Sequence, residues 1–138
     1  MKGDTIRYRG GYKYELSEDY TVVLPLSIPK GIATDWFIMS DTGVLTVIRG
    51  YAWDGPSGPA IDTGNFMRGS LIHDVLYQMM REGLLSQDYR MIADEILRVI
   101  CLEDGMCTLR AWWVYHGVRL GAGPCSRPEN DRPIKEAP

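Results

Sequence analysis

The spacing of the hydrophobic residues changes once along this chain, near Asn65, and that change constrains the fold more than any other feature. Before it, apolar residues alternate with polar ones, which is the period of a half-buried strand. After it, they recur every three or four positions, which is the period of an amphipathic helix. The sequence therefore predicts an α+β protein in which N-terminal antiparallel β hairpins pack on a C-terminal three-helix unit.

Turn signals divide the first fifty residues into two hairpins. Gly10-Gly11 and Asp41-Thr42-Gly43 lie between alternating segments, and such residues tolerate the backbone of tight turns. The run 20–26 ends in prolines, which suits an edge strand. The stretch 51–64 is rich in glycine and proline, so we expect a loop without regular structure there.

Three helices are expected after this loop. The first runs from about Asn65 to a stop at Gly83, the second begins near Ser86 as N-cap and runs to about 103, and the third spans about 108–120. Short connections favour antiparallel neighbours, and Trp112 and Trp113 are assigned to the core. We expect one globular domain over 1–121 (1–50 β unit, 51–64 loop, 65–121 helices) and a polar, proline-rich tail over 122–138.

The composition of the chain disfavours several classes of partner and of site. The 138 residues include 15 Lys+Arg and 18 Asp+Glu, a net charge of -3, which argues against nucleic acid as a partner. The three cysteines have no CxxC spacing, so we expect neither a zinc knuckle nor a disulfide framework. The N-terminus has no apolar region of a signal peptide, and no run approaches the ~20 apolar residues of a membrane span.

The string HDVLY is the most informative motif. His73 and Tyr77 are four residues apart and share one face of the expected helix, whereas Asp74 is turned about 100° away. Asp94 follows His73 by 21 residues, the length of one antiparallel helix hairpin, so it can return to face His73. A carboxylate on one imidazole nitrogen leaves the other free to accept a proton from water.

A hard-cation site can lie beside this pair. Asp54, the carbonyls around Gly55 and Asp74 are candidate ligands, and calcium prefers such oxygen donors. A bound cation would polarise an ester carbonyl and hold its developing oxyanion. Zinc is disfavoured because the chain has only two histidines.

Each of these residues also has an ordinary structural explanation. His73 and Asp94 can be a buried hydrogen-bonded pair without a substrate, and Tyr77 can simply be a core residue. Asp54 and Asp62 can be turn residues, and Ser57 lacks the strand and helix of a nucleophile elbow. The combination of the Gly-rich loop, the HD-x-x-Y helix and Asp94 favours the chemical interpretation.

The stretch from Gly50 to Gly121 resembles a small uncharacterised family common in tailed phages and prophages. The matching segments have the patterns G-x-x-x-D-x-x-S-x-P, HD-x-L-Y, R-x-x-A-D and Y-x-x-V-R, and they fall on Gly50, Asp54, Ser57, Pro59, His73, Asp74, Leu76, Tyr77, Arg90, Ala93, Asp94, Tyr115, Val118 and Arg119. Gly121 departs from the final spacing. The resemblance implies a phage origin.

The same residues are similar to the active-site layout of secreted phospholipase A-two enzymes. This resemblance implies that His73 is the base, Asp94 its partner and Tyr77 a support. It also implies that Asp74 and Asp54 are calcium ligands. In this sequence a fifty-residue β unit precedes the loop, and the disulfides that usually flank the histidine are absent.

Three functions therefore remain open. The first is a phage-encoded, calcium-dependent ester hydrolase of phospholipase type that acts on lipid during entry or lysis. The second is a non-catalytic virion or accessory protein that binds other virion proteins through its tail and β hairpins. The third is a peptidoglycan-cleaving metalloenzyme, for which the sequence offers few ligands. We expect synthesis in the host cytoplasm, with the virion as a further location.

Overall fold

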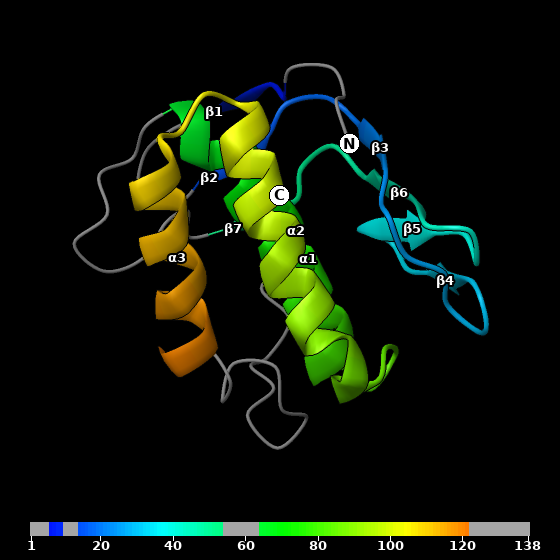
Figure 1. Cartoon of the computed structure of the whole chain (residues 1–138). Helices are drawn as coiled ribbons and strands as arrows, with labels where there is room; N and C mark the ends of the chain where they lie inside the picture. The colour runs from blue at the N-terminus through cyan, green and yellow to red at the C-terminus, as the bar shows by residue number, and fades with distance from the viewer. Residues whose placement is uncertain (1–5, 10–13, 54–63, 122–138) are drawn as a thin grey trace.

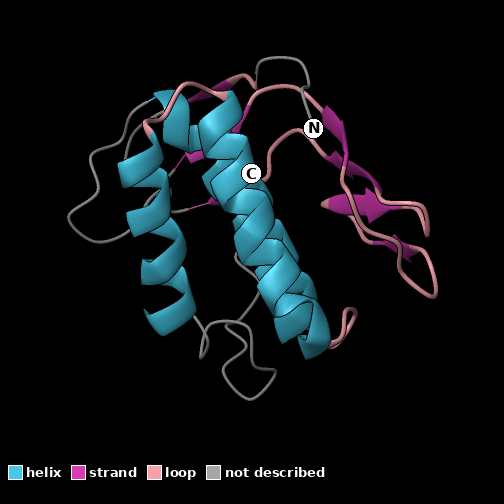
Figure 2. Ribbon diagram, viewed as in Figure 1, coloured by secondary structure: helices cyan, strands magenta, loops and turns pink. Residues whose placement is uncertain are grey.

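The computed structural model describes residues 6–9, 14–53 and 64–121, and these residues form two small sheets and three α-helices (Figure 1). The α+β class predicted from the sequence is confirmed: antiparallel strands fill the N-terminal part, and the helices follow. Figure 2 shows the helices side by side, with one sheet standing against them on one flank.

The strands pair in antiparallel fashion within each sheet. The first sheet has the order β1-β2-β7 and the second has the order β3-β6-β5-β4. Their bounds are β1 Tyr8–Arg9, β2 Tyr14–Leu16, β3 Tyr20–Val23, β4 Ile32–Ala33, β5 Phe37–Met39, β6 Val44–Val47 and β7 Ala52–Trp53. The edge position of β3 and the hairpin of β5 and β6 agree with the sequence prediction.

The expectation of no regular structure across 51–64 is wrong at its start. Ala52 and Trp53 form β7 and pair with β2, with Trp53 opposite Tyr14. The rings of these two residues lie with centroids 5.7 Å apart. This aromatic pair across the strands stabilises β7. A strand of two residues is too short to show a hydrophobic period, so the sequence did not reveal it.

The helices follow their sequence signals closely. α1 spans Gly64–Arg81, a short 3₁₀ turn spans Gln87–Tyr89, α2 spans Arg90–Glu103 and α3 spans Thr108–Gly121. The hydroxyl of Ser86 accepts a hydrogen bond from the Asp88 amide, but it caps the 3₁₀ turn rather than α2 itself. After α1, Gly83 has a φ of 73°, the left-handed conformation expected at a helix stop.

α1 is the central element of the fold. Every residue from 66 to 77 is buried except Asp74, which is half-buried. The main core joins apolar residues of α1 and α2 to the inner face of the four-stranded sheet, where Phe37, Leu45 and Val47 have no exposed surface. A helix covered on nearly all sides can hold polar groups only if each finds a partner.

Arg68 is one such buried polar residue, and it ties three elements together. Its guanidinium donates to both carboxylate oxygens of Asp104, at 3.0 and 2.8 Å, and to the hydroxyl of Tyr20 at 3.0 Å. It also pairs with Glu103 at 3.2 Å. Burial alone would lower the pKa of Arg68, but these bonds to Asp104 and Tyr20 raise it overall. Arg68 therefore joins α1 to strand β3 and to the end of α2 as a permanent cation.

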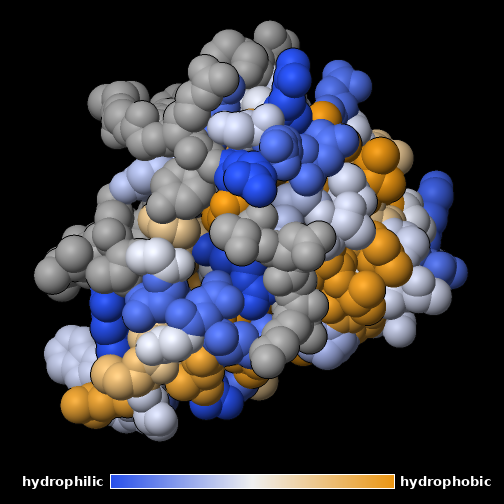
Figure 3. Space-filling model, turned by 90° about the horizontal axis from the view of Figure 1, so that it is seen from above, coloured by the Kyte–Doolittle hydropathy of each residue, from blue (hydrophilic) through white to orange (hydrophobic). Residues whose placement is uncertain are grey.

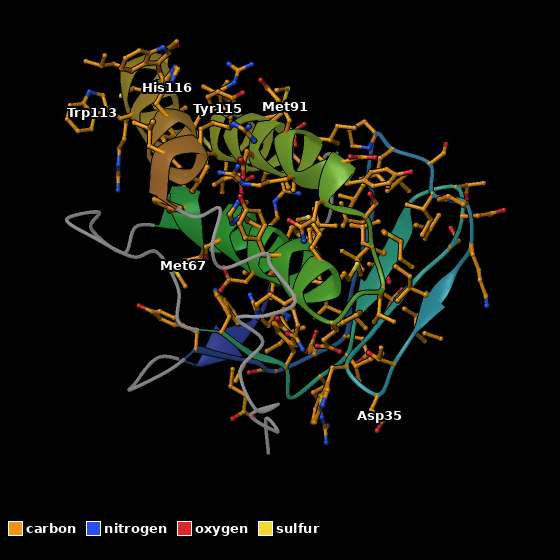
Figure 4. The ribbon with its side chains drawn as sticks, turned by 90° about the horizontal axis from the view of Figure 1, so that it is seen from below. Asp35, Met67, Met91, Trp113, Tyr115 and His116 are labelled. Atoms are coloured by element: carbon orange, nitrogen blue, oxygen red, sulfur yellow. The ribbon has the colours of Figure 1, made fainter. Side chains whose placement is uncertain are left out.

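α3 does not bury the residues that the sequence assigns to the core. Trp112 and Trp113 are 53% and 68% exposed, and Ala111 is the one buried residue of the helix. In Figure 4, Trp113 and His116 point outward from α3. Seen from above, hydrophobic residues gather on separate parts of the described surface with hydrophilic residues between them (Figure 3). Periodicity cannot tell an apolar face that meets the core from one that meets solvent.

α1 and α2 approach each other closely at Gly69. A Cβ atom added there would lie 3.0 Å from Cys101 Sγ and 3.0 Å from Leu97 Cδ1. Gly69 lies one turn before His73 on α1, and Leu97 lies one turn after Asp94 on α2. The small residue therefore sets the distance between the two helices beside the pair that the sequence analysis singled out.

We expect Gly69→Ala to be less stable than Gly117→Ala by about 1 kcal/mol or more, because the added methyl group must displace Cys101 and Leu97. Gly117 lies in α3 with nothing within 4 Å of its added Cβ, so Ala there gains helix propensity without a clash. Urea unfolding of the two variants measures the difference. Equal stabilisation by both substitutions would mean that Gly69 does not set the approach of the helices.

Candidate functional site

The carboxylate of Asp94 on α2 has no exposed surface and accepts three hydrogen bonds. Its Oδ1 lies 2.7 Å from Nε2 of His73 and accepts from the hydroxyl of Tyr77 at 2.6 Å. Its Oδ2 accepts from Nη1 of Arg119 at 2.9 Å. The contact between His73 and Asp94 is the one that their spacing along the helix hairpin predicts.

Helical spacing on α1 places two of these donors together. His73 and Tyr77 are one turn apart, so both face α2, and their rings lie with centroids 4.1 Å apart at 36°. The close helix approach at Gly69 continues along this face. The imidazole and the phenol can therefore reach the same carboxylate oxygen.

Two arginines complete the cluster, and the sequence analysis gave neither of them a role. Arg90 Nε donates to the hydroxyl of Tyr77 at 3.3 Å, and its Nη2 donates to the carbonyl oxygens of Val118 and Arg119 at 3.3 and 2.7 Å. Arg119 then reaches back to Asp94. Arg90 lies four residues before Asp94, a spacing that places both on one face of a helix and could have indicated a shared site.

The charges of the cluster follow from these contacts. Burial alone would raise the pKa of Asp94, but hydrogen bonds from His73, Tyr77 and Arg119 hold it below its ordinary value. Burial, followed by the bond to Asp94, raises the pKa of Tyr77. Asp94 is therefore an anion at neutral pH, and Tyr77 is a neutral donor.

The imidazole of His73 has one nitrogen committed and one available. An anionic acceptor at Nε2 selects the tautomer that carries its proton there, which leaves the lone pair on Nδ1. Among the described residues, no hydrogen bond is made to Nδ1. The residue is 7% exposed, so a small reactant such as water could reach the ring only through a narrow opening.

Of the remaining predicted site residues, Asp74 is the one that the described part of the chain includes. Asp74 is on α1, next to His73 in the chain but outside the cluster around Asp94, and it is half-buried. Asp54, Gly55, Ser57 and Asp62 lie outside the described residues. Within residues 6–9, 14–53 and 64–121, no group of three or more His, Cys, Asp or Glu side chains could hold a metal ion.

Trp53 fixes the chain just before the predicted loop. Its indole Nε1 donates to the hydroxyl of Ser70 at 3.0 Å, and Ser70 donates in turn to the carbonyl oxygen of Met67. Ser70 lies three residues before His73 on α1. Since α1 begins at Gly64, both ends of the segment 54–63 join the part of the molecule that carries His73.

Comparison with known proteins finds no matching family model, no matching curated protein and no matching solved structure. No helix of the described part of the chain is long and apolar enough to cross a membrane.

Asp94→Asn should lower the free energy of unfolding by about 3 kcal/mol at pH 7, because an ionised partner of Arg119 is lost from a fully buried position. The pKa of Asp94 is lower in the folded protein than its ordinary value of 3.8. Its contribution is therefore present above that value and is lost as the pH falls through the folded pKa.

The difference between wild type and Asp94→Asn should thus shrink below about pH 4, while carboxylates common to both proteins cancel. Urea unfolding at a series of pH values measures it. A difference that stays constant below pH 3.8, where both proteins are still folded, would show that the fold does not hold the pKa of Asp94 below its ordinary value.

Proposed function

We propose that the protein is a phage-encoded ester hydrolase of phospholipase type, in which His73 is the general base. The observation that supports this is the hydrogen bond between His73 Nε2 and Asp94 Oδ1, with Tyr77 on the same oxygen. This arrangement orients a neutral imidazole and leaves Nδ1 to act on water.

The reaction is a hydrolysis. His73 Nδ1 removes a proton from water as the oxygen attacks the ester carbonyl, and Asp94 stabilises the imidazolium that forms. The tetrahedral intermediate then expels the alcohol, which takes the proton from His73. Carboxylic acid and alcohol are the products, and the imidazole returns to its neutral form.

We infer that the site holds a calcium ion, which would stabilise the oxyanion. Asp54, the Gly55 carbonyl and Asp74 are the proposed ligands, all oxygen donors of the kind that calcium takes. Asp74 is the one residue between 66 and 77 that is not buried, which suits a carboxylate at the edge of a site. The bond from Trp53 to Ser70 holds the residue that precedes Asp54 against the helix that carries His73. When bound, calcium would polarise the ester carbonyl.

His73→Gln should reduce ester hydrolysis at least about a hundredfold, because the amide can donate to Asp94 but cannot act as a base. Release of fatty acid from phospholipid vesicles, followed by titration at constant pH, measures the rate. His116→Gln is the matched control, since His116 is exposed and contacts the ring of Trp112 on α3, with centroids 4.3 Å apart. It should keep the wild-type rate.

The same variants separate catalysis from structure. The hydrolase proposal expects the melting temperature of His73→Gln to stay within about 5 °C of wild type while the rate is lost. A wild-type protein that releases no fatty acid with calcium present would refute the proposal. An unchanged rate in His73→Gln would refute the role of His73 as the general base.

Asp74→Asn and Asp54→Asn should each weaken calcium binding about tenfold or more, because each removes one anionic ligand from a hard cation. Isothermal titration calorimetry measures the affinity. Asp88→Asn, a substitution in the 3₁₀ turn, is the control and should bind as wild type does. No heat of binding in the wild-type protein would remove calcium from the proposal.

The exposed face of α3 favours a second candidate, a non-catalytic virion or accessory protein that binds other virion proteins. Leu109, Trp113 and Leu120 are 69%, 68% and 89% exposed, and they recur at helical spacing. Exposed apolar stripes of this kind are typical of contact surfaces. On this alternative, His73→Gln loses stability and no ester is cleaved by the wild-type protein.

A further inference from the structure

α3 contributes little to the core, yet one of its side chains reaches the buried carboxylate. Ala111 is the one residue of the helix that is buried, whereas Trp112, Trp113 and Leu120 are largely exposed. Arg119 lies in the last turn, and its side chain is 26% exposed. It donates from Nη1 to Asp94 Oδ2 at 2.9 Å. The attachment of this end of α3 therefore has a polar part, beside the packing of Val118 on an apolar cluster.

Arg90 holds the same turn from the other side. Its Nη2 donates to the carbonyl oxygens of Val118 and Arg119, two of the unpaired acceptors at a helix C-terminus. Its Nε donates to Tyr77, which itself donates to Asp94. Arg90 thus fixes the position of the Arg119 backbone, and the Arg119 side chain fixes the orientation of the Asp94 carboxylate.

The two oxygens of Asp94 are used differently, and Arg119 enforces the difference. Oδ1 accepts hydrogen bonds from His73 and Tyr77, and Oδ2 accepts one from Arg119. The χ2 torsion of an aspartate has a broad minimum, so a carboxylate bound on one side only is free to turn. A guanidinium bound to the second oxygen fixes the plane, and its charge favours the ionised form in a position without solvent.

We propose that Arg119 is a positioning residue that keeps Asp94 ionised and keeps its Oδ1 directed at His73, so that the last turn of α3 is part of the site. The effect of Arg119 on catalysis rests on the proposed hydrolase function. Its effect on the ionisation and orientation of Asp94 is independent of that function. The titratable and charged groups around Asp94 come from three helices. His73 and Tyr77 of α1 and Arg119 of α3 bond to it directly, and Arg90 of α2 bonds to Tyr77. The charge of Asp94 also acts on Tyr115 of α3, as does that of Glu95 of α2.

The direct test is an NMR titration of the side-chain carboxyl carbon of Asp94, assigned by its loss in Asp94→Asn. In the wild type, Asp94 should stay ionised to the lowest pH at which the fold persists. In Arg119→Gln, its midpoint should rise by about one pH unit or more. Arg119→Lys should give a smaller rise, because lysine keeps the charge but not the planar fork.

Arg98→Gln is the matched control. Arg98 pairs with Glu95 at 3.3 Å on the surface of α2, and its loss should leave the titration of Asp94 unchanged. If Arg119→Gln does not fold, Arg119→Lys decides the question by its titration. Wild-type behaviour of Asp94 in every folded Arg119 variant would overturn the proposal.

The kinetic test uses the same variants. Arg119→Gln should lower kcat about tenfold or more and leave KM nearly unchanged, and Arg119→Lys should restore part of the rate. A rise in KM alone would contradict a positioning role. If the wild type cleaves no ester, the hydrolase proposal fails, and the titration of Asp94 still decides the role of Arg119.

Discussion

The carboxylate of Asp94 is the group on which the arrangement of the helices depends. A charge with no exposed surface is costly unless each of its oxygens has a donor, and here the donors come from α1 and α3 while the acid is on α2. The three helices must therefore close together for all of these bonds to form. Satisfying one buried acid orients an imidazole, a phenol and a guanidinium at the same time.

The rest of the fold supports this cluster in stages. Gly69 allows α1 and α2 to approach, Arg68 ties α1 to strand β3 and to the end of α2, and Trp53 joins strand β7 to α1 beside His73. The four-stranded sheet covers α1 with apolar side chains such as Phe37. The β unit thus covers the apolar face of α1. The polar face, with His73 and Tyr77, is turned toward α2.

The sequence predicted the hairpin of β5 and β6, the three helices and the proximity of His73 and Asp94, because all of these follow from local turn chemistry and helical period. It missed β7, since two residues carry no period, and the role of Arg68, since a lone arginine in a helix usually faces solvent. It placed Trp112 and Trp113 in the core, because an apolar face has the same spacing whether or not another element covers it. Arg119 went unrecognised because its partner lies on another helix.

The sequence by itself determined the α+β class, the order of the elements and the one face of α1 that carries His73 and Tyr77, since these are set by neighbours within a few residues along the chain. Only the tertiary structure decided which surface of α3 stays exposed and which charges share Asp94. Those outcomes depend on how whole helices pack, and the energy of a buried charge depends on donors that are distant in sequence. The local sequence pattern specifies which side chains share a face of each helix. The packing of the helices decides which partners those side chains contact.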